Sequence, residues 1–135
     1  MIPFRLSFEP GTSLYEQVVY AAKKAMVSGQ MRAGDPFPSV RALSKELKIN
    51  PNTAHKVVTQ LVNEGLIEVR AGTGTVVSER AASTAAERSN LLQKELEQLV
   101  VEAKKLGLDL DAVMDSVRQH WRRLDGTDKI QRSKE

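Results

Sequence analysis

Four side chains with hydrogen-bonding or basic ends lie close together between residues 52 and 56. They are Asn52, Thr53, His55 and Lys56, and they supply an amide, a hydroxyl, an imidazole and an ammonium group. On a helix that begins near residue 50, these positions fall on the outer face of the first two turns. Amide and hydroxyl groups bind base edges, and ammonium groups bind phosphates. The spacing therefore predicts recognition of nucleic acid.

Patterns for catalysis or metal binding are weak in this sequence. It contains no cysteine, and its two histidines, His55 and His120, lie on separate predicted helices with no second ligand at metal-binding spacing. Asp109, Asp111 and Asp115 offer carboxylates, but their spacing is typical of the capped, acidic start of a helix. We therefore expect no enzyme activity, no metal site and no cofactor.

Two short helices joined by a tight turn are predicted to position the polar side chains. Ser39 is expected to cap the first helix, a role that explains it better than that of a nucleophile. Residues 48–50 form the turn, and Asn50 caps a second helix with Pro51 at its first position, where proline is tolerated. The buried stripes at helical spacing are Val40, Leu43 and Leu47, then Ala54, Val57, Val58 and Leu61. This layout predicts a helix-turn-helix whose second helix enters the DNA major groove.

The formal net charge of +3 lies in the first part of the chain. Residues 1–80 contain ten Lys/Arg against seven Asp/Glu, whereas residues 81–135 contain ten of each. Within residues 39–60, the charged residues are Arg41, Lys45, Lys48 and Lys56 against Glu46 alone. A basic cluster on one element is typical of nucleic-acid binding, but charge alone fits a solvated helix face equally well.

The segment before the two helices is expected to complete a small core. Residues 4–8 alternate in polarity and predict a short strand or an extended arm. Ser13 and Glu16 fit a capping box that opens a helix, which Gly29 ends. Residues 34–38 are too rich in glycine and proline for a regular element, and they predict a turn.

A β-hairpin is predicted after the second helix of the motif, with strands at residues 67–70 and 75–77. Its tip contains Gly72-Thr73-Gly74, and the absence of side-chain bulk there lets backbone amides approach a phosphate or the minor groove. Arg70 supplies charge nearby. As a nucleotide-binding loop the same glycines are weak evidence, because a Walker loop needs a Lys-Ser/Thr step and a following helix. We interpret the hairpin as a wing.

Several separate motifs between Thr12 and Ser78 occur in the order found in one family. They are Leu14-Tyr15-Glu16-Gln17, Gly29 to Gly34-Asp35, Pro38-Ser39-Val40-Arg41, Leu43-Ser44, Asn50-Pro51-Asn52-Thr53, Glu64-Gly65-Leu66-Ile67 and Gly72-Thr73-Gly74. In this order they resemble the GntR family of bacterial winged-helix regulators. The resemblance implies a winged helix-turn-helix that binds DNA.

The resemblance also implies roles for particular residues. Arg41 would hold a phosphate or a guanine edge, and the Ala71-Gly72 tip would reach the minor groove. Pro51 and His55 stand where some branches of the family have arginines, which leaves the base preference open. Asn52, Thr53 and His55 would read bases, and the basic residues would bind phosphates. The expected DNA-binding residues are Arg41, Lys45, Asn52, Thr53, His55, Lys56, Arg70, Ala71 and Gly72.

The remaining residues predict a linker and a helical hairpin. Residues 79–86 are small and polar, and a helix with heptad-like apolar spacing is expected from Arg88 to about Leu106. Gly107 ends it, and Asp109 caps a second amphipathic helix. The residues expected to form a dimer core are Leu92, Leu96, Leu99, Leu106, Val113, Val117 and Trp121, the last as an anchor rather than a stacking platform. Residues 125–135 are polar and expected to be disordered.

Two amphipathic helices joined by a glycine turn cannot cover both of their apolar stripes. A second copy of the chain is the simplest partner, and the short tail resembles the YtrA subfamily, in which it is a dimerisation module. The alternative is that the hairpin folds back on the winged helix as extra core. Only 57 residues follow Ser78, too few to enclose a sizeable ligand pocket. The sequence does not indicate whether a small-molecule effector binds the protein.

The sequence thus predicts a mainly α-helical protein with a small β wing. It comprises a winged helix-turn-helix domain (1–78), a linker (79–86), a dimerisation hairpin (87–124) and a tail (125–135). The expected function is that of a homodimeric repressor that binds an inverted-repeat operator in double-stranded DNA. In the YtrA subfamily the regulated genes often encode transporters.

The alternative function is that of a winged helix that binds only other proteins. No apolar run approaches the roughly 20 residues needed to span a bilayer, the start of the chain lacks a signal-peptide pattern, and cysteine is absent. We therefore expect a cytoplasmic protein.

Overall fold

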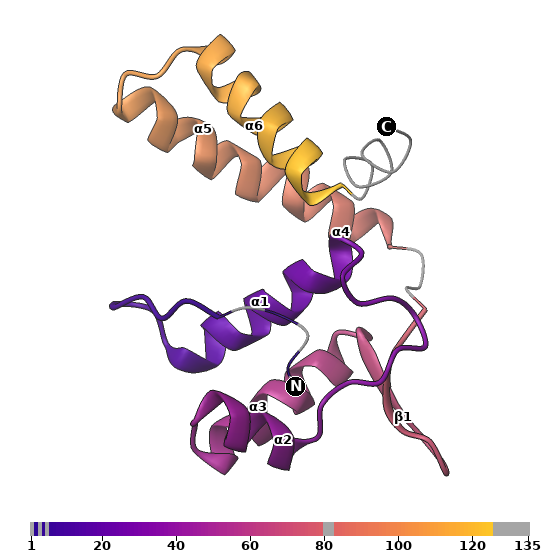
Figure 1. Cartoon of the computed structure of the whole chain (residues 1–135). Helices are drawn as coiled ribbons and strands as arrows, with labels where there is room; N and C mark the ends of the chain where they lie inside the picture. The colour runs from indigo at the N-terminus through magenta and orange to yellow at the C-terminus, as the bar shows by residue number, and fades with distance from the viewer. Residues whose placement is uncertain (1, 3, 5, 80–82, 126–135) are drawn as a thin grey trace, which may run out of the picture. The chain divides into compact units, whose positions relative to one another are not determined.

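The computed structural model describes residues 2, 4, 6–79 and 83–125. The chain divides into two compact units, Met1–Arg80 and Ala81–Glu135. Elements of the first unit are α1 (Leu14–Val27), α2 (Val40–Leu47), α3 (Pro51–Asn63), β1 (Ile67–Arg70) and β2 (Gly74–Val77). Elements of the second are α4 (Ala85–Ser89), the π-helix η1 (Asn90–Glu95), α5 (Leu96–Lys105) and α6 (Leu110–Leu124). Figure 1 shows this order along the chain. The expected fold class, mainly α with a small β wing, is confirmed.

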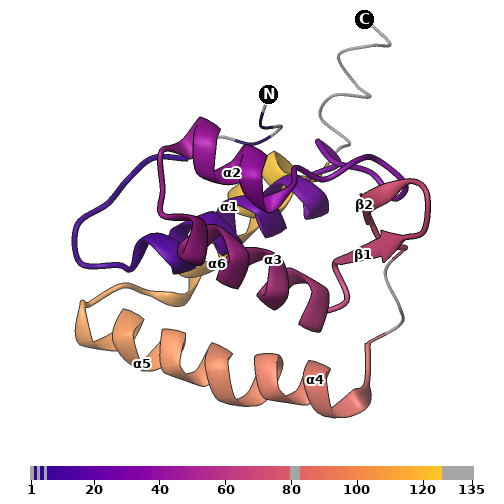
Figure 2. The same ribbon diagram turned by 90° about the horizontal axis from the view of Figure 1, so that it is seen from below.

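The core of the first unit forms where α3 packs against both α1 and α2. Figure 2 shows these helices gathered together, with the β1–β2 hairpin at one end of α3. The most deeply buried large side chains are Val18, Leu43, Val57, Leu61, Ile67 and Val76. The buried stripe of α3 is Ala54, Val57 and Leu61, as the periodicity predicted, while Val58 is half-buried. Burial of this stripe leaves the opposite face of α3 free for solvent.

The starts of α2 and α3 are each capped by a side-chain hydrogen bond. Ser39 Oγ accepts from the amide of Ala42 at 3.1 Å, and Asn50 Oδ1 accepts from the amide of Asn52 at 2.7 Å. Pro51 occupies the first position of α3. Both predicted N-caps are confirmed, so the start of α3 is fixed by local chemistry.

Of the two forms expected for residues 4–8, a strand or an extended arm, the strand is not formed among the described residues before α1. The side chain of Gln17 binds the backbone that follows this segment. Its amide accepts from the Glu9 N–H at 2.9 Å and donates to the Glu9 carbonyl at 2.8 Å. Phe4 is buried and its ring stacks 6.3 Å from that of Phe37. Phe8, by contrast, is 58% exposed.

The capping box expected at Ser13 is only half formed. Ser13 Oγ accepts from the Glu16 amide at 3.1 Å, but the Glu16 carboxylate accepts from Ser13 Oγ at 2.8 Å instead of from the Ser13 amide. A complete capping box occurs at Thr84 and Glu87, at the start of α4. The helix of the second unit therefore begins at Ala85, inside the segment predicted as a linker.

The wing contains the two strands that the sequence predicted, and a third segment also contacts it. Strands β1 and β2 pair antiparallel, with Ile67 opposite Val77 and Arg70 opposite Gly74. Residues 34–38, predicted as a turn, also contact the sheet: Pro36 bridges to Val76, and the Phe37 amide donates to the Thr75 carbonyl at 2.8 Å. The chain entering α2 therefore lies along β2 and anchors the wing to the helices.

The second unit contains the two predicted helical runs, but the first is not a uniform α-helix. Residues 90–95 form a π-helix between α4 and α5, which the heptad-like spacing did not predict. Gly107, with a φ of 78°, ends the run, and Leu108 N–H returns to the Ala103 carbonyl at 3.0 Å. Asp109 caps α6, as expected. The predicted disorder of 125–135 falls, after residue 125, outside the described residues.

Candidate nucleic-acid interface

The outer face of α3 carries the predicted polar side chains. Asn52, His55 and Lys56 are exposed, and Thr53 is half-buried. Beneath them Ala54 is fully buried, which fixes the rotation of the helix about its axis. The structure therefore presents these four side chains together on one surface of a rigid helix.

Arg41 and Lys45 add positive charge on α2. Both are exposed, and within the described part of the chain neither forms an ion pair. Their charge is therefore available to an external anion. A shallow crevice of about 340 Å³ also lies between α1 and α3 and is lined by Tyr15, His55, Lys56, Thr59 and Gln60. The predictions did not include Tyr15, because its proximity to His55 depends on how the two helices pack. They also omitted Thr59 and Gln60, which lie one turn after His55 and Lys56 on α3.

The wing carries the remaining predicted residues. Ala71 and Gly72 are exposed at its tip, where Gly72 has a φ of 77°, a conformation that glycine adopts readily. Arg70 is exposed as well, but its Nε lies 2.8 Å from Glu68 Oε2. Hydrogen bonds from Arg70 and then Ser78 hold the pKa of Glu68 below its usual range. Sequence reasoning did not identify this pairing.

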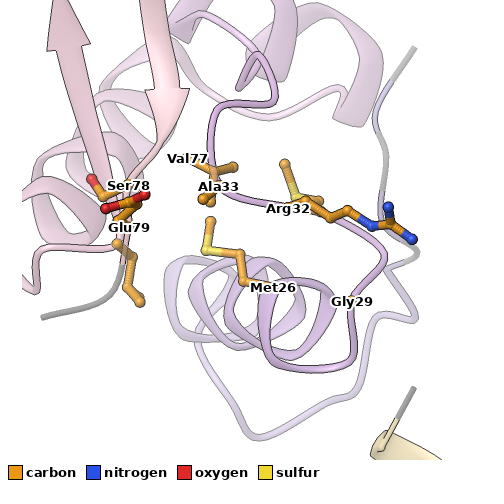
Figure 3. Close-up of a pocket in the computed structure, with 9 residues that line it drawn as sticks. Met26, Gly29, Arg32, Ala33, Val77, Ser78 and Glu79 are labelled. Atoms are coloured by element: carbon orange, nitrogen blue, oxygen red, sulfur yellow. The ribbon is translucent and has the colours of Figure 1, made fainter. Parts of the chain in front are cut away.

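Another cavity lies away from these residues. It has a volume of about 310 Å³ and lies between the end of α1, the following loop and the end of β2. Figure 3 shows Met26 and Val77 among its lining side chains, while the guanidinium of Arg32 points away from them. The lining lacks a set of converging polar groups, so we assign no ligand to it.

Residues 2, 4, 6–79 and 83–125 carry neither a metal-binding cluster nor a candidate membrane-spanning helix. Among these residues, no group of three His, Cys, Asp or Glu side chains is arranged to hold a metal ion. No helix among them combines the length and apolar character required for membrane crossing.

The apolar stripes of the second unit are largely exposed in the single chain. Leu106 and Trp121 are 69% and 73% exposed, and in the described part of this unit only Ala103 is buried. The other predicted dimer residues are Leu92, Leu96, Leu99 and Val117, all exposed, and Val113, which is half-buried. An apolar surface of this kind is typical of a protein interface.

Three helices followed by a two-stranded wing define the winged helix-turn-helix class of proteins. Residues 14–77 match the family described as bacterial regulatory proteins, gntR family. Over 109 residues the chain is 35% identical to the HTH-type transcriptional repressor YtrA of Bacillus subtilis. This match covers 80% of this chain and 84% of that protein. The chain therefore belongs to the GntR family, and the resemblance to the family and to YtrA is confirmed.

Solved structures agree with this assignment. A GntR family transcriptional regulator from Listeria monocytogenes is 26% identical, with a TM-score of 0.63 over 83% of this chain and 98% of that one. A protein described as a transcriptional antiterminator, from Listeria monocytogenes EGD-e, has a TM-score of 0.78 over 90% of this chain and 91% of its own, at 20% identity. The second likeness concerns the fold alone. As a member of the GntR family, the protein is a DNA-binding transcriptional regulator.

Proposed function

We propose that this protein is a homodimeric repressor that binds an inverted-repeat operator. The observation that carries the proposal is the polar face of α3, with Asn52, His55 and Lys56 exposed above a buried apolar stripe. A helix of this kind fits the major groove, where an asparagine amide pairs with adenine through two hydrogen bonds. Thr53 and His55 extend the set of base-reading groups.

Phosphate binding is assigned to the basic residues around this helix. Arg41 and Lys45 on α2 and Lys56 on α3 place cationic groups beside the base-reading face. The Ala71-Gly72 tip of the wing is small and exposed, which suits approach to the minor groove, with Arg70 beside it. In this assignment, phosphate contacts orient the protein and α3 selects the sequence.

Dimerisation is assigned to the second unit. Its exposed leucines on α5 and Trp121 on α6 form an apolar surface that a second copy would cover. A two-fold dimer places two copies of α3 in symmetric positions, and this symmetry requires an inverted repeat in the DNA. The relative YtrA is named as a repressor, which favours repression here, and transporter genes are the candidate targets.

Selection from a random pool of DNA duplexes tests this proposal. The wild-type protein is expected to enrich one inverted repeat, and Asn52→Ala is expected to lose preference at one base position in each half-site. Exposed Gln119 on α6 provides a matched control, because Gln119→Ala removes an amide outside the proposed DNA interface. Failure of the wild type to enrich any sequence would favour the alternative function, a winged helix that binds only proteins.

A further inference from the structure

The wing carries an ion pair on one face of β1. The carboxylate of Glu68 accepts a hydrogen bond from Arg70 Nε at 2.8 Å. Glu68 and Arg70 are two positions apart on β1, so their side chains leave the same face of the hairpin. Glu68 is half-buried and Arg70 is exposed. The pair therefore ends at an exposed cation.

The geometry of the Arg70 contact leaves part of its guanidinium available. Glu68 contacts Nε, the nitrogen nearest the stem, and this contact restrains the plane of the planar guanidinium group. Within the described residues, neither terminal nitrogen of Arg70 forms an ion pair or hydrogen bond. A guanidinium held by one edge presents its other donors in a fixed direction, which suits a phosphate oxygen.

A purely stabilising role does not explain this pair. The side chains of Arg70 and Glu68 are 47% and 46% exposed, and ion pairs at such exposure contribute little to the free energy of unfolding. A carboxylate beside a DNA-binding arginine also repels phosphates, which weakens attraction to all duplexes alike. The same carboxylate would favour a duplex that places a phosphate where the oriented arginine can reach it.

We propose that Glu68 is a positioning residue that orients Arg70 towards one phosphate of the operator and suppresses binding to unrelated DNA. The proposal rests on the DNA-binding function proposed above. It adds a determinant of specificity that touches no base, because Glu68 acts through Arg70.

Two substitutions at Glu68 separate orientation from charge. Glu68→Gln keeps a carbonyl oxygen that accepts from Arg70 Nε but removes the negative charge, whereas Glu68→Ala removes both. We expect Glu68→Ala to lower the ratio of operator affinity to random-duplex affinity about tenfold, the effect of losing one oriented contact. Glu68→Gln should keep operator affinity within about twofold of the wild type, since the acceptor is retained.

Glu9→Gln is the matched control, because it removes one carboxylate from an exposed position outside the wing. Affinities for the selected operator and for a random duplex are measured at one salt concentration, with melting temperatures to verify folding. In an Arg70→Ala background, Glu68→Ala should leave the affinity ratio unchanged. A ratio for Glu68→Ala equal to that for Glu9→Gln, or an Arg70→Ala variant that binds like the wild type, would overturn the proposal. A wild type that does not distinguish the two duplexes would instead refute the proposed function.

Discussion

Lys23 Nζ lies 3.0 Å from Glu64 Oε1, and this ion pair joins α1 to the residue that caps the end of α3. Gln60 Nε2 donates to the other oxygen of the same carboxylate at 2.7 Å. Glu64 therefore connects the C-terminal end of α3 both to the preceding turn of that helix and to the neighbouring α1. This contact supports the orientation of α3 from the end opposite to Asn50.

Removal of this carboxylate should have an effect that depends on pH. The Gln60 hydrogen bond and the Lys23 charge hold the pKa of Glu64 below its usual range. The ionised form thus stabilises the fold above the unfolded pKa of about 4.3, and this contribution is lost as the pH falls through the lower folded pKa. Glu64→Gln should lower the free energy of unfolding at pH 7 by at most about 1 kcal/mol, since the pair is partly exposed.

Thermal unfolding at pH 7 and at pH 3 measures this effect. The difference between Glu64→Gln and the wild type should be smaller at pH 3 than at pH 7, and Lys23→Met should show the same dependence. Exposed Glu97 on α5 lies in the other unit, so Glu97→Gln controls for the general loss of a carboxylate. A destabilisation by Glu64→Gln that persists unchanged at pH 3 would rule out the charge as its cause.

Lys48 should tolerate glycine better than a β-branched residue. It caps α2 in the left-handed conformation, with a φ of 56°, where the Cβ of an L-residue is disfavoured by roughly 1–2 kcal/mol. Lys48→Gly should therefore raise the free energy of unfolding by up to about 1 kcal/mol, while Lys48→Val should lower it. Urea denaturation checks both variants, and equal stability of the two would contradict the backbone explanation.

Arg41→Ala should weaken DNA binding by roughly 1–3 kcal/mol, either for all sequences or at one guanine position. The arginine is exposed on α2 without an ion pair among the described residues, so its loss should leave the fold intact. Exposed Arg122 on α6 offers a matched substitution, Arg122→Ala, outside the proposed DNA interface. Mobility shifts at fixed salt would count against the role of Arg41 if both variants bound equally well.

Polar substitutions in the second unit should dissociate the proposed dimer. Leu99 is 50% exposed and Trp121 is 73% exposed, so neither is needed for the core of the single chain. A Leu99→Lys, Trp121→Ser variant should sediment as a monomer and bind the operator far more weakly, as should a chain ending at Ser78. Tyr20→Ser removes a ring that is 62% exposed on α1 and should leave the proposed dimer intact. Dimers of the chain ending at Ser78 would contradict the assignment.

The sequence predicted the parts of the fold that depend on local chemistry. The caps at Ser39 and Asn50 and the helix stop at Gly107 are set by a few neighbouring residues, and each was located correctly. The bridge between Pro36 and Val76 was missed because it joins segments 40 residues apart. Gly and Pro correctly indicated that this segment is irregular but could not indicate that it lies beside β2.

The sequence also predicted the part of the candidate site that depends on local helical structure. The face of α3 follows from helical periodicity, so Asn52 and Lys56 were placed without knowledge of the fold. The ion pair between Glu68 and Arg70 was not predicted, although residues two apart on a strand share a face. The spacing does not show that the two side chains turn towards each other.

Genomic footprinting of the wild-type protein against Asn52→Ala tests the central claim most directly. Insertion of α3 from each of two paired copies into adjacent major grooves predicts protection of two half-sites in inverted orientation, centred about one helical turn, roughly 10 base pairs, apart or a multiple of it. Asn52→Ala should lose this pattern at the same protein level. Protection spread evenly over all duplexes, or identical footprints for both proteins, would contradict the account.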